Sequence, residues 1–102
     1  MTTFAGTWNV IIDTPLRKMQ AVFDIKEHDG VITGVGSNEE ESVDFFDVVA
    51  DGNRLTWSQA VSKPMKLTLK FDVTVDGEAM AGTAKAGIFP ASKLEGTRSA
   101  EG

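Results

Sequence analysis

Few side chains in this chain could take part in chemistry, and two of them stand out. The sequence contains no cysteine, no tyrosine and a single histidine, His28. This composition excludes nucleophilic triads, the usual zinc sites and disulfides. His28 precedes an Asp-Gly turn, where we expect it to be solvated. Any catalysis would therefore rely on a carboxylate, a lysine or an amide, and the candidates are Asp47 and Gln59.

Both candidates have two interpretations. We expect Asp47 to point inward, where burial would make its carboxylate a better general base, but an aspartate at a bulge can also cap its own turn. Gln59 is an inward-facing amide, and a buried amide needs hydrogen-bond partners. It either bonds a neighbouring backbone group or orients a ligand. The glutamates of 39–41 lack the alternating pattern of a calcium loop, and no glycine motif opens a helix, so we predict no metal and no cofactor.

The elements that position these side chains are strands. From Met65 to Val75 every second residue is large and apolar, and the residues between them are polar. This period of two predicts a strand with one buried and one solvated face. Asp76-Gly77 then supplies the residues of a tight hairpin turn, and Asp29-Gly30 and Asp51-Gly52 repeat that turn.

Eight such strands are predicted, at the spacing of an all-β barrel or sandwich. Their ranges are 7–13, 19–27, 31–36, 42–50, 54–61, 65–75, 78–86 and 93–99. The predicted fold is therefore all-β, a single eight-stranded up-and-down antiparallel β-barrel. We predict one domain over residues 1–102, with the barrel at about 6–99. The strand at 42–50 does not alternate cleanly, which predicts a bulge near Asp47.

The connections differ between the two ends of this barrel. Alternate connections share an end, which places the three Asp-Gly turns together and the longer, irregular loops 13–18, 36–41, 61–64 and 87–92, which hold all three prolines, at the opposite end. We call these the turn end and the loop end. Sites are commonly built from loops of this kind.

The inward-facing side chains follow the same polarity, with bulky residues toward the turn end and many small ones toward the loop end. A barrel of this size can be filled by its own side chains or hold one small ligand. We predict a pocket for a small, mainly apolar molecule at the loop end, with Phe89 as its lid. The predicted ligand-binding residues are Met19, Ala21, Gly36, Gln59, Val61, Met65, Leu67, Ala84, Ala86, Phe89 and Leu94. In the alternative interpretation, the glycines and alanines only let the sheet curve or accept a neighbour's bulk.

Two short motifs carry a family resemblance. Gly6-Thr7-Trp8 and Gly96-Thr97-Arg98 resemble the calycin superfamily of lipocalin-like barrels. In that superfamily a G-x-W on the first strand meets an arginine on the last strand. The resemblance implies that Trp8 and Arg98 close the barrel through an arginine–indole contact. The chain is also similar to a family of small bacterial barrels found alone or appended to amidohydrolases. That similarity covers Gly6–Trp8, Asp13–Pro15, Asp51–Trp57, Pro64–Leu67, Val75–Gly77, Lys85–Gly87 and Gly96–Arg98.

Composition limits the partners. The net charge of −5 and the pI of about 4.7 argue against nucleic-acid and anionic-membrane partners. No apolar run approaches the roughly 20 residues that span a bilayer, and strand-like sequence begins by Thr7. We therefore expect a cytoplasmic protein. Ile11, Val22, Val31 and Val35 fall on the outer faces of the first three predicted strands, and we expect a homodimer through them.

Two other functions remain open at this point. The barrel could be an enzyme of the isomerase or cyclase type that acts on a hydrophobic small molecule through Asp47 or Gln59. It could also be an accessory module that docks to a partner protein.

Overall fold

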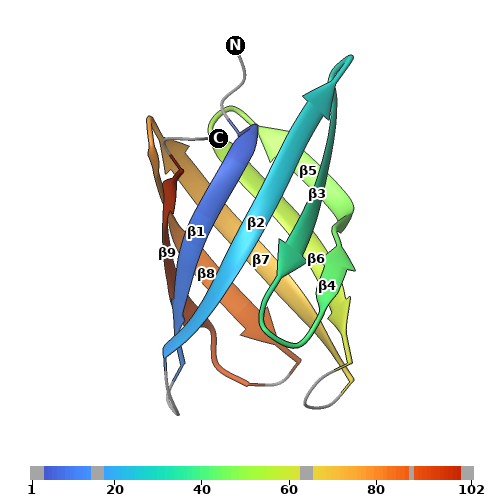
Figure 1. Cartoon of the computed structure of the whole chain (residues 1–102), viewed down its shortest axis with the longest axis vertical. Helices are drawn as coiled ribbons and strands as arrows, with labels where there is room; N and C mark the ends of the chain where they lie inside the picture. Colours follow the sequence, from blue (N-terminus) through green and yellow to red (C-terminus); the bar gives the residue numbers. More distant parts are fainter. Residues whose placement is uncertain (1–3, 15–17, 63–65, 88, 100–102) are drawn as a thin grey trace.

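A single antiparallel sheet curls into a nearly closed barrel (Figure 1). The computed structural model describes residues 4–14, 18–62, 66–87 and 89–99, and nine strands lie within these ranges. The strands are β1 (Gly6–Asp13), β2 (Lys18–His28), β3 (Val31–Ser37), β4 (Ser42–Asp44), β5 (Phe46–Asp51), β6 (Arg54–Val61), β7 (Leu67–Asp76), β8 (Ala79–Ala86) and β9 (Ser92–Arg98). They are ordered β4-β3-β2-β1-β9-β8-β7-β6-β5, so the first and last strands pair and the others follow the chain.

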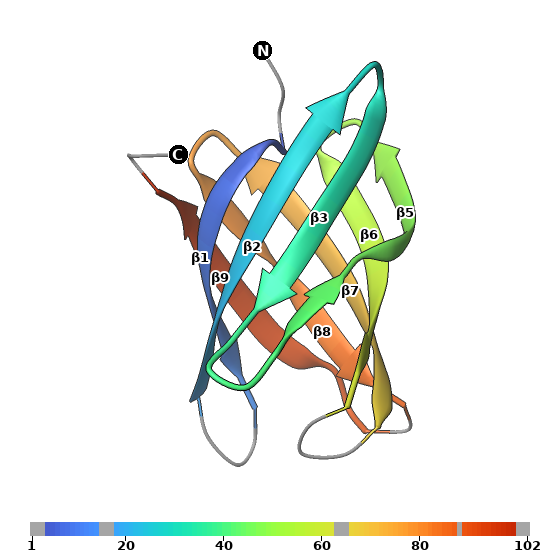
Figure 2. The same ribbon diagram turned by 45° about the vertical axis from the view of Figure 1, so that its right-hand side comes forward.

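The all-β, barrel-shaped, up-and-down arrangement is confirmed, but the predicted number of eight strands is wrong. The segment predicted as one strand at 42–50 is divided at Phe45 into β4, which pairs with β3, and β5, which pairs with β6 (Figure 2). Asp47 has a left-handed φ of +53°, and the register between β5 and β6 shifts between Phe46 and Val49. The predicted bulge near Asp47 is therefore present, and the strand breaks beside it.

The two ends of the barrel differ as predicted. The turn end carries the short connections at Asp29-Gly30, Gly52-Asn53 and Gly77-Glu78, seen at the top of Figure 1. Gly30, Gly52 and Gly77 have φ values of +81°, +62° and +63°, the left-handed conformation that glycine adopts without steric cost. The strand ends that the longer connections join lie together at the bottom.

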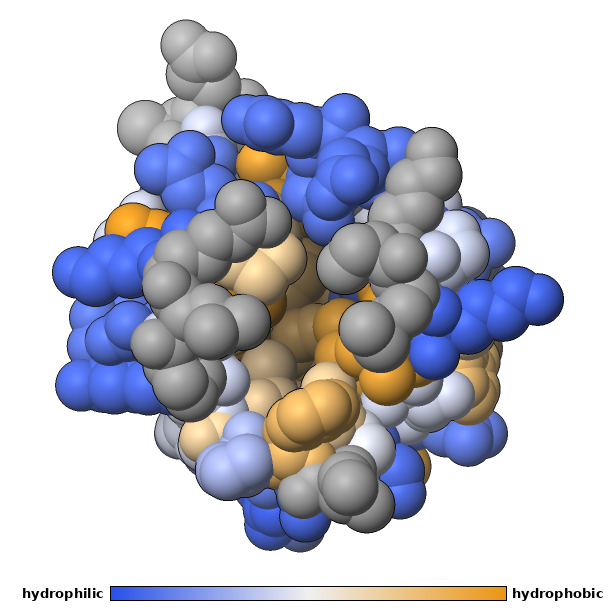
Figure 3. Space-filling model, turned by 90° about the horizontal axis from the view of Figure 1, so that it is seen from below, coloured by the Kyte–Doolittle hydropathy of each residue, from blue (hydrophilic) through white to orange (hydrophobic). Residues whose placement is uncertain are grey.

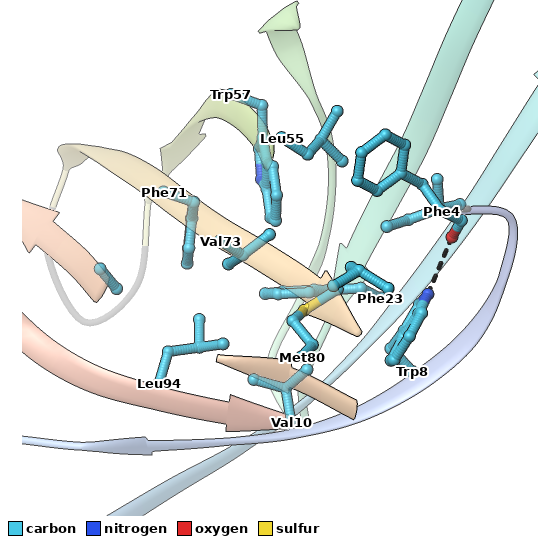
Figure 4. Close-up of a cluster of buried hydrophobic side chains, with 13 residues drawn as sticks. Phe4, Trp8, Val10, Phe23, Leu55, Trp57, Phe71, Val73, Met80 and Leu94 are labelled. Atoms are coloured by element: carbon cyan, nitrogen blue, oxygen red, sulfur yellow. Dashed lines mark hydrogen bonds between the residues drawn. The ribbon is translucent and has the colours of Figure 1, made fainter. Parts of the chain in front are cut away.

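The turn-end half of the barrel is filled with side chains. Those that are almost completely buried there are Trp8, Ile25, Leu55, Val73, Val75 and Met80. Phe4, which precedes the predicted barrel, is also buried at 5% exposure and packs in the same core (Figure 4). The indole Nε1 of Trp8 donates a hydrogen bond of 2.8 Å to the Phe4 carbonyl oxygen. The segment before β1 thus contributes both an apolar side chain and an acceptor to this end.

Arg98 joins three parts of the turn end. Trp8 and Arg98 are direct partners in the β1–β9 ladder, and the guanidinium carbon lies 4.5 Å from the centre of the Trp8 ring. The same guanidinium donates to the carbonyl oxygens of Ala5 and of Gly77, the latter at 3.0 Å. Its Nε lies 3.2 Å from the carboxylate of Glu78. The expected contact between Trp8 and Arg98 is therefore present where the first and last strands meet.

An ion pair between Arg54 and Asp72 links β6 and β7 on the outer face of the sheet. Arg54 donates two hydrogen bonds to the Asp72 carboxylate, Nε to Oδ1 at 2.8 Å and a terminal nitrogen to Oδ2 at 2.5 Å. These bonds hold the pKa of Asp72 below its ordinary value. Because both side chains are substantially exposed, we expect the pair to add little to the free energy of unfolding.

We predict that Trp8→Ala lowers the free energy of unfolding by about 3–5 kcal/mol, as truncations of large core residues do. Urea denaturation followed by circular dichroism measures this loss. Asn9→Ala is the matched control, since Asn9 follows Trp8 in β1 but is exposed. A loss below about 1 kcal/mol for Trp8→Ala would contradict the role of Trp8 in closing the barrel.

Candidate functional site

Four aromatic side chains cross the barrel midway along its strands. The ring of Trp57 on β6 stacks between Phe45 and Phe71, at centroid distances of 4.4 and 5.0 Å and interplanar angles of 13°. Phe23 on β2 meets all three rings edge-on at 5.2–5.7 Å. We call these four residues the aromatic layer. Offset stacks and edge-to-face pairs each stabilise a fold by about 0.5–1.5 kcal/mol beyond the burial of their area. The aromatic layer separates the turn-end half of the barrel interior from the loop-end half.

Two glycines of β3 make room for side chains that meet this layer. A Cβ placed on Gly34 would lie 2.4 Å from a ring carbon of Phe45, and one placed on Gly36 would lie 2.6 Å from Oε1 of Gln59. The sequence alone left open whether such small residues enclose space or accept a neighbour's bulk. At Gly34 and Gly36 they accept bulk.

On the loop-end side of the aromatic layer the inward-facing side chains form an apolar cup. Its walls are partly buried and consist of Ile12, Met19, Ala21, Val61, Leu67, Leu69 and Ala86. Its floor is buried and consists of Trp57, Gln59, Phe71, Ala84 and Leu94. Seen from the loop end, the molecule is hollowed and its hollow is lined by apolar atoms, with hydrophilic residues around the outside (Figure 3). A separate, shallow hollow of about 360 Å³ lies at the loop-end edge of β6 and β7, against Ala60–Ser62 and Lys66–Thr68, most of which are exposed.

Gln59 is a buried polar residue at the floor of the cup. Its side chain is 5% exposed, and its Oε1 accepts a hydrogen bond of 3.0 Å from the indole Nε1 of Trp57. Within the described ranges Nε2 donates to no protein atom, and it is not a fully buried atom. The amide oxygen of Gln59 thus bonds a neighbouring side chain rather than a backbone group, and the orientation of a ligand by its amide nitrogen stays a prediction.

The predicted site residues divide into groups. Gly36, Gln59, Ala84 and Leu94 are buried at the floor, while Met19, Ala21, Val61, Leu67 and Ala86 are wall residues. Phe89, which was predicted as a lid, is 56% exposed. Met65 lies outside the described residues. Ala84 is only 8% exposed and pairs with Phe71, so the expectation that it borders open space is wrong, and Ala86 takes that position.

Asp47 is not part of the cup, and the expectation that it points inward is wrong. Its side chain is exposed on the outer surface. Phe45 and Val48 both pack against the core, so inward positions switch from odd to even numbers between them. The left-handed residue Asp47 accommodates this switch and is turned outward by it.

A clasp between two loops lies at the rim of the cup, and the sequence did not predict it. Both carboxylate oxygens of Glu41 accept hydrogen bonds from Ser62, one from its backbone N–H and one from its hydroxyl, each at 3.0 Å. Asn38 orders the same loop, because its Oδ1 accepts the backbone N–H groups of Glu40 and Glu41. The clasp joins the connection before β4 to the end of β6, beside the break in the sheet.

We predict that Glu41→Ala lowers the free energy of unfolding by about 1 kcal/mol, since a carboxylate acceptor of two hydrogen bonds is lost at a partly exposed site. Urea denaturation measures the difference. Glu39→Ala is the control, because Glu39 is an exposed carboxylate in the same loop. Equal effects of the two substitutions would contradict the clasp.

A second hollow lies on the outer surface, across β2, β3 and β4. It has a volume of about 430 Å³ and is lined by Asp24, Lys26, Thr33, Gly34, Val35, Asp44 and Phe45. Its lining mixes both signs of charge, so it shows no preference for a charged ligand. Among the residues that the structure describes, no three His, Cys, Asp or Glu side chains gather in a group that could hold a metal ion.

Comparison of the chain with protein-family models, with curated proteins and with solved structures found no match. The fold and the site are therefore interpreted from their own geometry. Over the described ranges, the chain contains no helix long and apolar enough to cross a membrane.

Proposed function

We propose that this protein binds a small, mainly apolar molecule in the cup at the loop end of the barrel. The observation that carries the proposal is the contrast between the two halves. On the turn-end side of the aromatic layer the inward side chains are almost completely buried except for Ile32, which is partly buried, and on the loop-end side the apolar walls remain partly exposed to solvent. A filled barrel would bury both halves alike.

The physical reason for binding is the apolar surface of the concave walls. Water in contact with such walls is released when an apolar ligand replaces it, at a gain of roughly 25 cal/mol for each Å² of apolar area removed from water. Ligand sites are typically concave, mainly apolar and supplied with a few polar groups that fix orientation. The cup has this composition, with Gln59 as its polar group.

Catalysis has less support than binding. Gln59 is the polar side chain at the cup floor among the described residues, and an amide neither gives nor takes up a proton near neutral pH. Asp47, the other predicted catalytic residue, is exposed on the outer surface. An isomerase or cyclase would need an acid or base that this part of the molecule does not supply.

The resemblance to calycin barrels belongs to the same proposal. It is supported by the contact between Trp8 and Arg98 at the meeting of the first and last strands. A cytoplasmic location is likewise only a proposal, made from the sequence.

Filling the cup tests the proposed function. We predict that the native protein takes up the fluorescent probe N-phenyl-1-naphthylamine and that Ala86→Leu loses this uptake while keeping its melting temperature. Overpacking a filled core would instead cost about 1–3 kcal/mol. Ala81→Leu is the matched control, because Ala81 lies on the same strand but faces outward.

The opposite result would remove the proposal. If the native protein binds no probe and Ala86→Leu is clearly destabilised, the barrel is solid. A docking module would then be the better interpretation.

We also propose that two copies of the chain associate weakly through the outer faces of β1, β2 and β3. Ile11 and Val22 are 45% and 38% exposed, and Val35 is partly buried. Because Ile11 pairs with Gln20, Val22 with Asn9 and Val35 with Asp24, these three side chains occupy diagonal neighbouring positions. Val31 lies apart, opposite His28 at the turn end. A stripe of three side chains is small, which favours a weak dimer.

Sedimentation velocity tests this association. We predict a concentration-dependent dimer for the native chain that Val22→Lys abolishes, since a lysine placed in the stripe would lose its hydration on association. Thr68→Lys is the control, because it adds the same charge at an exposed position of β7. A native protein that stays monomeric at every concentration would remove the proposal.

A further inference from the structure

We propose that the molecule bound in the cup carries a neutral carbonyl oxygen at its inserted end and that Nε2 of Gln59 donates a hydrogen bond to it. The inference rests on the proposed function and adds the chemical class of the ligand. Ketones, aldehydes, esters and amides with an apolar body belong to this class.

The contact with Trp57 fixes the orientation of the Gln59 amide. An indole N–H can only donate, so the atom of Gln59 that lies 3.0 Å from Nε1 of Trp57 must be the amide oxygen. Trp57 is itself held between the rings of Phe45 and Phe71. The amide group also lies against Gly36, where a side chain would collide with both its oxygen and its nitrogen. The polar contact and the packing together hold Nε2 in one place.

Nε2 of Gln59 carries two N–H donors. Gln59 is only 5% exposed to solvent. Within the described ranges no protein atom accepts a hydrogen bond from its Nε2. A buried donor left without a partner costs about 1–3 kcal/mol. Water reaching through the open cup can serve as a partner in the empty protein. A ligand that expels this water must supply an acceptor or lose affinity.

The charge of the lining limits the charge of the ligand. The walls and floor of the cup, as far as the structure describes them, include no charged side chain, and their polar groups are the amide of Gln59 and the hydroxyl of Ser92, the partner of Ala84. The lysines near this end, such as Lys66 and Lys93, are exposed. A carboxylate at the floor would lose its hydration with no cation to compensate, which is far more costly than burying a neutral carbonyl. The floor therefore selects a neutral acceptor over both an anion and a plain hydrocarbon.

Three naphthalenes of nearly equal shape test this selection. In 2-acetylnaphthalene the planar substituent carries a neutral carbonyl, in 2-isopropenylnaphthalene a hydrocarbon group replaces it, and in 2-naphthoate a carboxylate does. We expect the ketone to displace N-phenyl-1-naphthylamine from the native protein with an affinity about five- to tenfold above that of the hydrocarbon. We expect the carboxylate to bind more weakly than either.

The side-chain amide signals in ¹H–¹⁵N spectra provide a second, direct measurement. The chain has two glutamines, Gln20 and Gln59, and Gln20 is exposed on the outer face of β2. The ketone should shift the amide protons of Gln59 and leave those of Gln20 unchanged. The hydrocarbon should produce no such difference.

Substitutions separate the donor from the packing. Gln59→Met keeps nearly the length of the side chain but removes the N–H donors, and Gln59→Leu also changes its shape. Each should abolish the preference for the ketone over the hydrocarbon, and Gln20→Leu should retain it. The comparison of the three probes on the native protein stands even where a variant fails to fold.

The outcomes distinguish the two proposals. Equal affinities for ketone and hydrocarbon, or unshifted Gln59 signals, would overturn the carbonyl inference and leave the cup as an apolar site. A native protein that binds neither probe nor any naphthalene would overturn the proposed function and the inference with it. A folded Gln59→Met protein that still prefers the ketone would also overturn the inference.

Discussion

The stacking of Trp57 between Phe45 and Phe71 is the interaction on which the rest of this barrel depends. Trp57 and Phe71 are direct partners in the β6–β7 ladder, Phe45 lies at the break between β4 and β5, and Phe23 meets all three rings edge-on. Together they limit how far the packed core extends from the turn end. They also place the indole N–H of Trp57 against Gln59, so the polar group of the cup is oriented by the core itself. Trp57 thus belongs to the packed core and also orients the polar group of the candidate site.

The broken strand follows from the same layer. Phe45 must reach the stack, and the chain must then continue along β6 to complete the barrel. An unbroken strand would keep inward positions at odd numbers, which would turn Val48 away from the core. The left-handed Asp47 removes that conflict, and Gly34 leaves the space that the Phe45 ring occupies. At the first and last strands no such break is needed, because Trp8 and Arg98 pair directly in the ladder.

The sequence was most informative where a strand has one buried and one solvated face. The alternation in β6 and β7 predicted their inward residues correctly, because a period of two has a single solution there. It failed at Phe45–Val49, where adjacent apolar residues fit either face. Phe4 lies before any periodic segment, and Glu41 reads as one more solvated glutamate although it binds a serine 21 positions later. Gly36 indicated a close approach without indicating that Gln59 makes it.

The pairing of Trp57 with Gln59 is the feature that packing alone does not explain. A phenylalanine at position 57 would preserve the stacked rings, and an apolar residue at 59 would then bury no polar atom. Replacing both partners of a buried hydrogen bond by apolar groups is often nearly neutral for stability, whereas half-satisfied polar groups are costly. The chain has instead an indole donor and an amide whose second half remains available at the floor of an apolar cup. In the empty protein water can accept the remaining N–H, and a group that expels this water from the floor would have to accept it instead.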